Sequence, residues 1–274
     1  MAGTTPRPID DGSRAAPARV AVVIPAYEEA ATIAALVHRC RLLGEVSQVV
    51  VVDDCSCDAT ARLAAEAGAQ VLRHDSNQGK GASLRDGMRA ALALGADHIA
   101  TLDGDGQHRP EDLPRLLACC RHWPGRIVIG SRRAASADAP RARAIANRVA
   151  DFWVSWAARH PIEDSQSGFR VYPSEVARRV ALRPDVASGF AFESEVLIEA
   201  GRLGFGTVAV DIPAIYGGGL RASHFRPVAD ITGIVLMVAA KLLRVGMDPV
   251  GLWRTVTVPR LRWQDDAWEQ PPKP

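Results

Sequence analysis

The sequence predicts an α/β fold: an open, mainly parallel sheet flanked by helices. Short apolar runs begin at Val20, Gln48, Gln70, Ile99 and Ile127, so successive starts lie 22 to 29 residues apart. This spacing is typical of right-handed βαβ crossovers. Polar clusters follow several of these runs, and in open α/β sheets ligands bind outside the carboxyl ends of the strands. The same pattern therefore predicts a ligand site along one edge of the sheet.

The first half of the chain alternates strand and helix patterns. The expected strands are apolar runs of buried-strand length, at 20–24, 48–52, 70–73, 99–102 and 127–129. Apolar residues at helical spacing predict helices at about 33–43, 58–67, 84–94 and 110–117. We expect Thr32 and Asp58 to cap the first two helices, because their side-chain oxygens suit the N-cap position.

The second half is less regular. Its expected elements are a helix over about 141–159, a polar turn leading to a strand that ends at Tyr172, a helix from Phe192 and a strand over 205–212. The glycine-rich stretch 216–227 indicates a loop or lid. The apolar stretch 231–245 is shorter than the roughly 20 residues that span a bilayer. It is expected to be either a core helix or an amphipathic helix at a membrane interface.

These patterns divide the chain into four expected parts. They are a disordered leader at 1–18, a catalytic domain at 19–228, an apolar and basic interfacial helix region at 229–254 and a flexible tail at 255–274. The leader lacks the apolar core of a signal peptide. Cations interleaved with tryptophans favour a helix at a membrane interface, because anionic lipids attract cations and Trp prefers the headgroup zone. These residues are Lys241, Arg244, Trp253, Arg254, Arg260, Arg262 and Trp263.

Composition excludes several classes of protein. The chain has 274 residues, of which 47% are hydrophobic and 23% charged, so it can bury a globular core. A net charge of +2 is too small for a general nucleic-acid surface, and no nucleic-acid partner is expected. The five cysteines are odd in number and lack zinc-site spacing, which indicates reduced thiols in the cytoplasm.

The stretch from Ile99 to His108 is the strongest candidate for a functional site. It places Asp103, Asp105 and Gln107 at alternate positions after an apolar strand. Alternate side chains of an extended segment point the same way, and two carboxylates with an amide oxygen suit Mg²⁺ or Mn²⁺. Magnesium usually takes its other ligands from water and substrate phosphates, so a nucleoside diphosphate group is the expected partner. The alternative is a solvated turn, because Asp and Gly are common turn formers.

Six motifs in order resemble the family 2 glycosyltransferases of GT-A fold, particularly dolichyl-phosphate mannosyltransferases and bacterial polyprenyl-phosphate glycosyltransferases. The resemblance covers about 20–230. The motifs are Val23-Ile-Pro-Ala-Tyr-Glu-Glu29, Val51-Val-Asp-Asp-Cys-Ser-Cys-Asp-Ala-Thr60, Asn77-Gln-Gly-Lys-Gly81, Asp103-Gly-Asp-Gly-Gln-His108, Gly130-Ser-Arg132 and Asp164-Ser-Gln-Ser-Gly-Phe169.

The resemblance implies a role for particular residues. Those that match the nucleotide-sugar site are Pro25, Tyr27, Glu29, Asp54, Lys80 and Asp103, with Asp103, Asp105 and Gln107 as metal ligands. Those that match the acceptor site are Arg132, Arg143, Ser167, Arg221 and Ser223. Asp105, Arg132, Arg143, Asp164 and Glu193 are the candidate catalytic residues.

Three positions depart from the family pattern. Glu28 stands where the family usually has Asn, and Cys55 where it usually has Gly, which points to altered base preference or loop geometry. His224 stands where lysine is common, and the preceding arginine is displaced to Arg221. The loop therefore departs from the family pattern at the positions that match acceptor contacts.

The resemblance implies inverting transfer of a hexose from a nucleotide-diphosphate sugar to a polyprenyl- or dolichyl-type lipid phosphate. The enzyme would be peripheral at the cytoplasmic face of the membrane, docked on the lipid surface or on a membrane partner protein. A lipid phosphate is already anionic near neutral pH and needs no general base.

Other functions stay open from the sequence. A hydroxyl acceptor on a glycan or glycolipid would need a base such as Asp164, Glu193 or Glu195. A non-catalytic nucleotide-sugar-binding scaffold is a third possibility, although the intact acidic motif argues against it. A nucleotidyltransferase would need a glycine- and lysine-rich loop after the first strand, where the chain has Pro25-Ala-Tyr-Glu-Glu29 instead.

Overall fold

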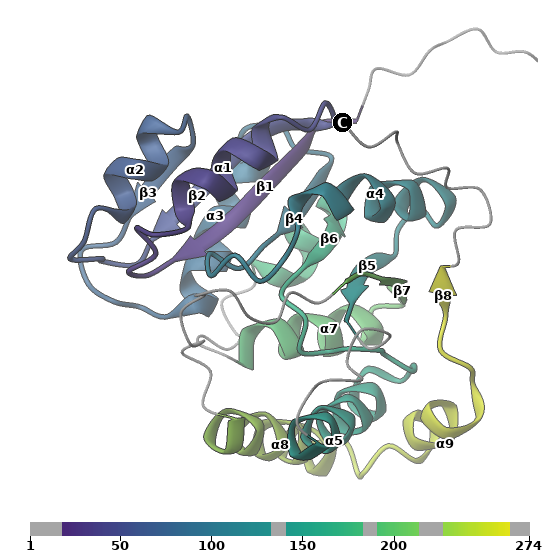
Figure 1. Ribbon diagram of the computed structural model, residues 1–274. Helices are drawn as coiled ribbons and strands as arrows, with labels where there is room; N and C mark the ends of the chain where they lie inside the picture. Colours follow the sequence, from purple (N-terminus) through teal and green to yellow (C-terminus); the bar gives the residue numbers. More distant parts are fainter. Residues whose placement is uncertain (1–17, 133–140, 183–190, 214–226, 264–274) are drawn as a thin grey trace, which may run out of the picture.

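The computed structural model describes residues 18–132, 141–182, 191–213 and 227–263, without the side chains of 141–144 and 227–231. In these residues, strands form one sheet in the order β3-β2-β1-β4-β6-β5-β7-β8 (Figure 1). In chain order the strands are β1 (Val20–Ala26), β2 (Val46–Asp53), β3 (Gln70–Arg73), β4 (His98–Thr101), β5 (Ile127–Ser131), β6 (Arg170–Pro173), β7 (Thr207–Asp211) and β8 (Arg262–Trp263). β6 is antiparallel to its neighbours β4 and β5, whereas the other adjacent pairs are parallel. The predicted open, mainly parallel sheet is confirmed.

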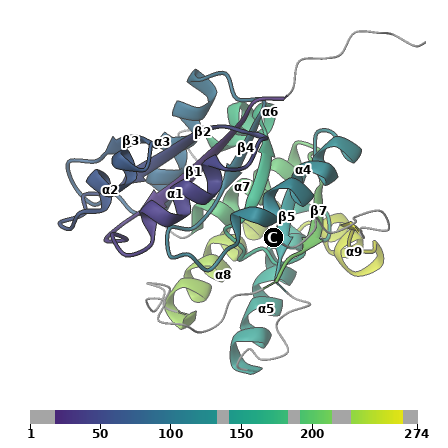
Figure 2. The same ribbon diagram turned by 45° about the horizontal axis from the view of Figure 1, so that its top comes forward.

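Helices cover both faces of this sheet. They are α1 (Ile33–Arg41), α2 (Thr60–Glu66), α3 (Lys80–Ala93), η1 (Pro110–Asp112), α4 (Leu113–His122), α5 (Arg141–Ala158), α6 (Ser174–Val176), η3 (Ala177–Ala181), α7 (Phe192–Arg202), α8 (Pro227–Arg244) and α9 (Pro249–Thr257). Successive side chains of a strand point to opposite faces. Val22 and Ile24 of β1 accordingly belong to the core that includes α1 and α4. Ala21 and Val23 belong to the core that includes α3 and α7. Both ribbon views show α1 and α3 on opposite sides of β1 and β2 (Figure 1, Figure 2).

Two expected helix caps have different roles in the structure. Thr32 precedes α1, but its side chain makes no cap bond and instead donates to the carbonyl oxygen of Gly104 at 2.7 Å. Asp58 lies two residues before the start of α2 and accepts from the backbone N–H of Ala30 at 3.2 Å. Both side chains therefore link separate loops. At Thr32 this tertiary contact replaces the expected capping bond. Asp58 keeps a local bond as well, because its Oδ1 accepts from the backbone N–H of Thr60, the first residue of α2, at 2.9 Å.

A helical layer lies beyond α7, away from α1 and α2 (Figure 1). α5 contacts α7, α8 and α9. On α8, Ile234, Val238 and Leu242 are buried at helical spacing, whereas Leu236 and Leu243 are 65% and 69% exposed. The apolar stretch therefore has one stripe in the core, as expected of a core helix, and another on the surface. Its place at a membrane interface stays a prediction. Along the described chain, no helix has both the length and the apolar character needed to cross a bilayer.

The C-terminal region contains two elements that the sequence analysis did not anticipate. The expected single helical region at 229–254 is divided between α8 and α9, and the break includes Met247 and Asp248 at positive φ. The expected flexible tail at 255–274 contains β8, which pairs with β7. Trp263 of β8 lies 4.7 Å from the ring of His122 on α4, measured between ring centroids.

Candidate active site

The polar motifs meet along one edge of the sheet. The neighbouring strands β2, β1 and β4 are parallel. Because β6 is antiparallel to both β4 and β5, β5 points the same way as these three strands, and all four carboxyl ends lie at this edge. β6 runs the opposite way and begins there, with Arg170 paired to Thr101 of β4 and to Ile129 of β5. The turn that holds Asp103 therefore lies beside the turn that precedes β6.

Asp103 is the centre of the site. Its Oδ1 lies 2.7 Å from Nζ of Lys80, and the same ammonium lies 2.7 Å from Oε2 of Glu193. Burial works against the charge of Asp103, but Lys80 outweighs it and lowers the pKa of Asp103 to about 2. Lys80 is the first residue of α3, not part of the preceding loop as expected, and Glu193 lies in the first turn of α7. The ammonium thus joins α3, the Asp103 turn and α7.

Asp103 also touches the turn before β6. A Cβ atom added at Gly168 would lie 2.5 Å from Oδ2 and 2.6 Å from Oδ1 of Asp103. Only a residue without a side chain leaves room for the carboxylate at this place. His108 lies 3.9 Å from Oδ2 of Asp103, and burial, then the charge of Arg132, lowers the pKa of this histidine to about 4. His108 is therefore neutral at pH 7.

Asp105 and Gln107 complete the expected metal-binding motif. Burial, followed by the charge of Asp103, raises the pKa of Asp105. The backbone N–H of Gln107 donates to Asp105 Oδ1 at 3.0 Å, which closes the turn. Within the described ranges, no group of three or more His, Cys, Asp and Glu side chains is placed to bind a metal. Two mutually repelling carboxylates with an amide are a smaller donor set, and they fit a divalent cation that takes its other ligands from substrate phosphates.

Asp54 organises the loop that leads to α3. Its Oδ1 accepts from the backbone N–H of Gln78 at 2.8 Å, and its Oδ2 accepts from that of Gly79 at 2.7 Å. His74 Nδ1 lies 2.7 Å from the same Oδ1, and His74 Nε2 lies 3.3 Å from Asp86 Oδ2. Asp54 thereby positions the backbone just before Lys80. This contact was not foreseen, because the family resemblance implied only that Asp54 belongs to the nucleotide-sugar site.

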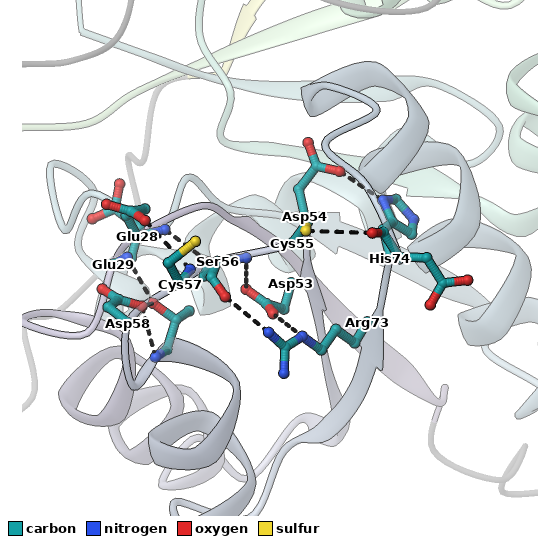
Figure 3. A network of polar contacts seen from close by, with 12 residues as sticks. Glu28, Glu29, Asp53, Asp54, Cys55, Ser56, Cys57, Asp58, Arg73 and His74 are labelled. Atoms are coloured by element: carbon teal, nitrogen blue, oxygen red, sulfur yellow. Dashed lines mark hydrogen bonds and ion pairs between the residues drawn. The ribbon is translucent and has the colours of Figure 1, made fainter.

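Figure 3 shows how the loops after β1 and β2 are joined. The N–H of Glu28 donates to Ser56 Oγ at 2.8 Å, and Glu28 Oε1 accepts from the N–H of Cys57 at 3.3 Å. The N–H of Glu29 donates to Thr60 Oγ1 at 2.8 Å. These bonds make one unit of two loops that the sequence assigned to nucleotide binding.

The two departures from the family pattern in these loops share a backbone feature. Glu28 has φ of 57° and Cys55 has φ of 65°. Asn and Gly enter this left-handed region more readily than Glu and Cys do. At both positions this chain therefore has a residue that adopts the left-handed conformation less readily than the family's usual one, and the expected change in loop geometry stays a prediction.

Pro25 and Tyr27 occupy the edge of this unit. Pro25 lies within β1 opposite Val52, and Tyr27, just past the strand, is 38% exposed. A Cβ atom at Gly104 would lie 3.1 Å from the Pro25 carbonyl oxygen and 3.2 Å from Glu29 Cγ. The loop after β1 therefore packs closely against the Asp103–Gln107 turn.

The acceptor-side motif forms a tight, buried turn. Asp164 has φ of 50°, and its Oδ2 accepts from the backbone N–H of Arg132 at 2.9 Å. The hydroxyl of Ser167 donates to the Gly130 carbonyl at 2.6 Å, which gives this residue a structural bond. Asp151 of α5, which sequence reasoning missed, accepts from the N–H of Ser165 at 2.8 Å and from that of Asp164 at 3.2 Å.

Arg170 is the second missed residue and has no exposed surface. Its guanidinium donates to the carbonyl oxygens of Ser167 and Ser165, each at 2.8 Å, and to that of Glu193 at 2.9 Å. One buried cation therefore fixes the acceptor turn relative to the start of α7. The available signal was an arginine inside the otherwise apolar strand after Phe169.

The remaining expected residues divide into two groups. Glu195, a candidate base, points toward α8, where its Oε1 lies 2.6 Å from Nζ of Lys241. The side chain of Arg143 and the whole of Arg221 and Ser223 lie outside the described residues. Arg132 is described, and its Nε lies 3.9 Å from Asp164 Oδ2.

Two relatives of this chain are named for the transfer or synthesis of sugar-linked polyprenyl phosphates. The chain is 31% identical over 207 residues to an undecaprenyl-phosphate mannosyltransferase of Micrococcus luteus, covering 71% of this chain and 82% of that one. It is 29% identical to a polyprenol monophosphomannose synthase of Mycolicibacterium smegmatis, covering 71% and 76%.

Solved structures share the fold. The mannosyl-3-phosphoglycerate synthase of Rubrobacter xylanophilus has a TM-score of 0.63 at 22% identity, covering 84% of this chain and 75% of that one. The Mycobacterium tuberculosis glucosyl-3-phosphoglycerate synthase in complex with Mn²⁺, UDP and glucosyl-3-phosphoglycerate has a TM-score of 0.58 at 24% identity, covering 83% and 79%. Residues 21–181 match the family described as Glycosyl transferase family 2. The chain is a member of that family of glycosyltransferases.

Proposed function

We propose that this glycosyltransferase moves a hexose from a nucleoside diphosphate sugar to the phosphate of a polyprenyl-type lipid, with inversion at the sugar. The observation that carries the proposal is the junction at Asp103. There Lys80 joins the Asp103 turn to Glu193, and Gly168 of the acceptor motif packs against the same carboxylate. Relatives with 31% and 29% identity are named as an undecaprenyl-phosphate mannosyltransferase and a polyprenol monophosphomannose synthase.

On the donor side, one group of residues would hold the metal ion and another positions Lys80. Asp103, Asp105 and Gln107 would hold Mg²⁺ or Mn²⁺, and such an ion supplies charge stabilisation for the departing nucleoside diphosphate. Structural neighbours contain UDP with Mn²⁺ or Mg²⁺. Asp54 fixes the backbone of Gln78 and Gly79 ahead of Lys80. The Lys80 ammonium is thus held beside the place where the diphosphate charge has to be balanced.

The carboxylates of the acceptor side favour a phosphate over a hydroxyl acceptor. Asp164 is occupied with the backbone of Arg132, Glu193 with Lys80 and Glu195 with Lys241. Each candidate base is therefore already engaged by a charged side chain or a backbone N–H within the protein. A lipid phosphate needs no base, and Arg132 with Arg143 would orient it, because a guanidinium matches phosphate in a two-point fork.

The first test is calorimetric binding of UDP and GDP with Mn²⁺ and then with EDTA. The proposal expects tight binding of one nucleotide that EDTA abolishes. It also expects the Asp105→Asn variant to stay folded and to lose turnover. Binding that survives EDTA would refute the metal role, and no binding in either condition would favour a non-catalytic scaffold.

The second test separates the two acceptor classes. GDP-mannose and UDP-glucose are offered with farnesyl phosphate and, separately, with farnesol. A phosphate acceptor predicts product with farnesyl phosphate alone and a larger loss in Arg143→Ala than in Glu193→Gln or Asp164→Asn. A hydroxyl acceptor predicts the reverse, with losses of about 10²–10⁴-fold in the carboxylate variants.

We further propose that the layer of α5, α8 and α9 docks on the cytoplasmic face of a membrane. Large apolar side chains are exposed on all three helices, namely Ile145, Val149, Phe152, Leu236, Leu243, Val250, Trp253 and Val256. Arg244 and Arg254 lie among them in the chain and are exposed. Cations beside exposed apolar residues and a tryptophan suit an anionic lipid interface.

Vesicle sedimentation tests this docking surface. Vesicles with phosphatidylglycerol are expected to bind the wild-type protein, and Leu243→Asp and Trp253→Asp are expected to weaken that binding by about tenfold each. The matched control is Leu42→Asp, because Leu42 is 71% exposed on a different side of the molecule, at the end of α1. Equal effects of all three substitutions would contradict this assignment.

A further inference from the structure

The last described strand reaches the acceptor turn. β8 pairs with β7, with Ala209 opposite Arg262, and the N–H of Ala209 donates to the Leu261 carbonyl at 3.0 Å. Trp263 packs against the core on the α4 side of the sheet. This pairing places the side chain of Arg262 at Glu163, which lies 99 residues earlier in the chain.

Arg262 and Glu163 form a two-point ion pair. Nε donates to Oε2 at 2.7 Å, and a terminal guanidinium nitrogen lies 2.5 Å from Oε1. The Glu163 side chain is 2% exposed, whereas that of Arg262 is 45% exposed. A buried carboxylate is costly unless a cation and hydrogen bonds offset its loss of hydration. Arg262 therefore allows a charged group to lie inside the turn.

Glu163 is adjacent to the strained residue of the acceptor motif. The hydroxyl of Ser131 donates to Glu163 Oε1 at 3.4 Å, and the next backbone N–H, that of Arg132, donates to Asp164 Oδ2 at 2.9 Å. Two successive residues at the end of β5 are thus linked to two successive residues of the turn. Because Asp164 has φ of 50°, the turn depends on such external links to keep its shape.

The same C-terminal segment is fixed at its other end. Trp156 Nε1 donates to the Asp248 carbonyl at 3.0 Å, and Arg159 Nε donates to Asp248 Oδ2 at 2.6 Å. Both donors belong to α5 or directly follow it, and Asp151 of α5 holds the N–H of Ser165. The segment 248–263 therefore contacts the α5 region at its start and Glu163 at its end, and both α5 and Glu163 contact the acceptor turn.

We infer that Arg262 is a positioning residue for the acceptor side of the active site. It acts through Glu163 on Asp164 and Arg132, and it does not touch the donor loops. Loss of this guanidinium leaves the Glu163 carboxylate buried without its cation, so the turn opens and Arg132 loses its fixed place. The effect on kinetics rests on the proposed function, whereas the effect on the turn does not.

Amide hydrogen exchange and steady-state kinetics of Arg262→Ala test the inference. Amides of Arg132, Asp164 and Ser165 are expected to exchange at least about tenfold faster, while those of Gln78 and Gly79 stay unchanged. With farnesyl phosphate as acceptor, its KM is expected to rise about tenfold and the nucleotide-sugar KM to change less than about twofold. Arg262→Lys keeps the charge but not the two-point bond. Its exchange rates and its farnesyl phosphate KM are expected to lie between those of wild type and of Arg262→Ala.

Arg39→Ala is the matched control. Arg39 forms a similar two-point pair with Glu111, at 2.8 and 2.5 Å, between α1 and η1. This control is expected to leave both KM values and the exchange of the acceptor turn as in wild type. The same exchange pattern in both alanine variants, or a uniform rise across the whole chain, would overturn the inference.

A charge-neutral pair guards against simple misfolding. Glu163→Gln/Arg262→Gln removes both charges and keeps amide hydrogen bonding, so it is expected to protect the turn better than Arg262→Ala does. If the double variant exchanges as fast as Arg262→Ala, the inference fails. If no donor and acceptor combination gives product, the proposed function fails and the exchange result alone decides the role of Arg262.

Discussion

Gly168 offers a sharp test of how the two halves of the site meet. In Gly168→Ala, the new Cβ would lie 2.5 Å from the nearer carboxylate oxygen of Asp103. An ordinary carbon–oxygen contact is about 3.3 Å, so the carboxylate or the turn has to move by about 0.8 Å. The carboxylate is not free to move, because Lys80 holds it at 2.7 Å. A displacement approaching 1 Å at a reacting group can cost about 10²-fold in rate, and we expect a loss of that order in kcat.

The assay combines turnover, Mn²⁺-dependent nucleotide binding and thermal unfolding. Gly168→Ala is expected to weaken nucleotide binding in Mn²⁺ as well as kcat, because Asp103 serves the donor side. Overpacking of this kind costs about 1–3 kcal/mol of stability, so the unfolding curve has to show a folded protein at the assay temperature. Gly44→Ala is the control, since a Cβ at Gly44 would have no atom within 4 Å. A folded Gly168→Ala enzyme with wild-type kcat and nucleotide affinity would refute the contact.

Two further predictions concern buried charges. Lys80→Met leaves Asp103 and Glu193 without their shared cation, so urea unfolding is expected to show a loss of about 3 kcal/mol, and a loss below about 1 kcal/mol would contradict the junction. Asp248→Asn removes a buried carboxylate. Burial alone would raise the pKa of Asp248, but the hydrogen bond from Arg159 outweighs burial, so the pKa is lowered in the folded protein. A carboxyl group whose pKa is lower in the folded protein stabilises the fold at pH values above its unfolded pKa of about 3.9. At pH 7 the free energy of unfolding of wild type is therefore expected to be about 1–2 kcal/mol larger than that of the variant. That difference should shrink as the pH falls below about 4, and a difference that is constant from pH 7 to pH 3 would contradict this role.

The first five strands could be predicted because each is an apolar run of strand length. The structure places β1 to β5 within a few residues of the expected ranges. β8 could not be predicted in this way, because two residues, Arg262 and Trp263, carry no alternation pattern. α9 had a local signal in Asp248 followed by Pro249, an N-cap residue before a first-turn proline, and the structure shows Asp248 accepting from the N–H of Gly251.

The site residues divide along similar lines. Asp103 and Asp105 could be predicted because they closely follow a buried strand. Asp151 and Arg170 could not, because Asp151 binds a backbone N–H 14 residues away and Arg170 also binds the carbonyl of Glu193, 23 residues away. Glu195 illustrates a local rule that would have helped. Residues two apart on a helix do not share a face, so Glu193 and Glu195 have to point to different surroundings. The structure gives them Lys80 and Lys241 respectively.

The charges gathered at the sheet edge lead to a last prediction about the acceptor. Around Asp103, in the described part of the site, the four carboxylates Asp103, Asp105, Asp164 and Glu193 outnumber the three cations Lys80, Arg132 and Arg170. A phosphate monoester adds about −1.5 to −2 charges near neutral pH, so the metal-free site repels it. A divalent cation at Asp103 and Asp105 removes that excess even without touching the acceptor. Farnesyl phosphate is therefore expected to bind at least about tenfold more tightly in Mn²⁺ than in EDTA, measured by calorimetry. In EDTA, Asp105→Asn should bind it more tightly than wild type, because one repelling charge is gone. Weaker binding by this variant in EDTA would show that the repulsion does not govern acceptor affinity.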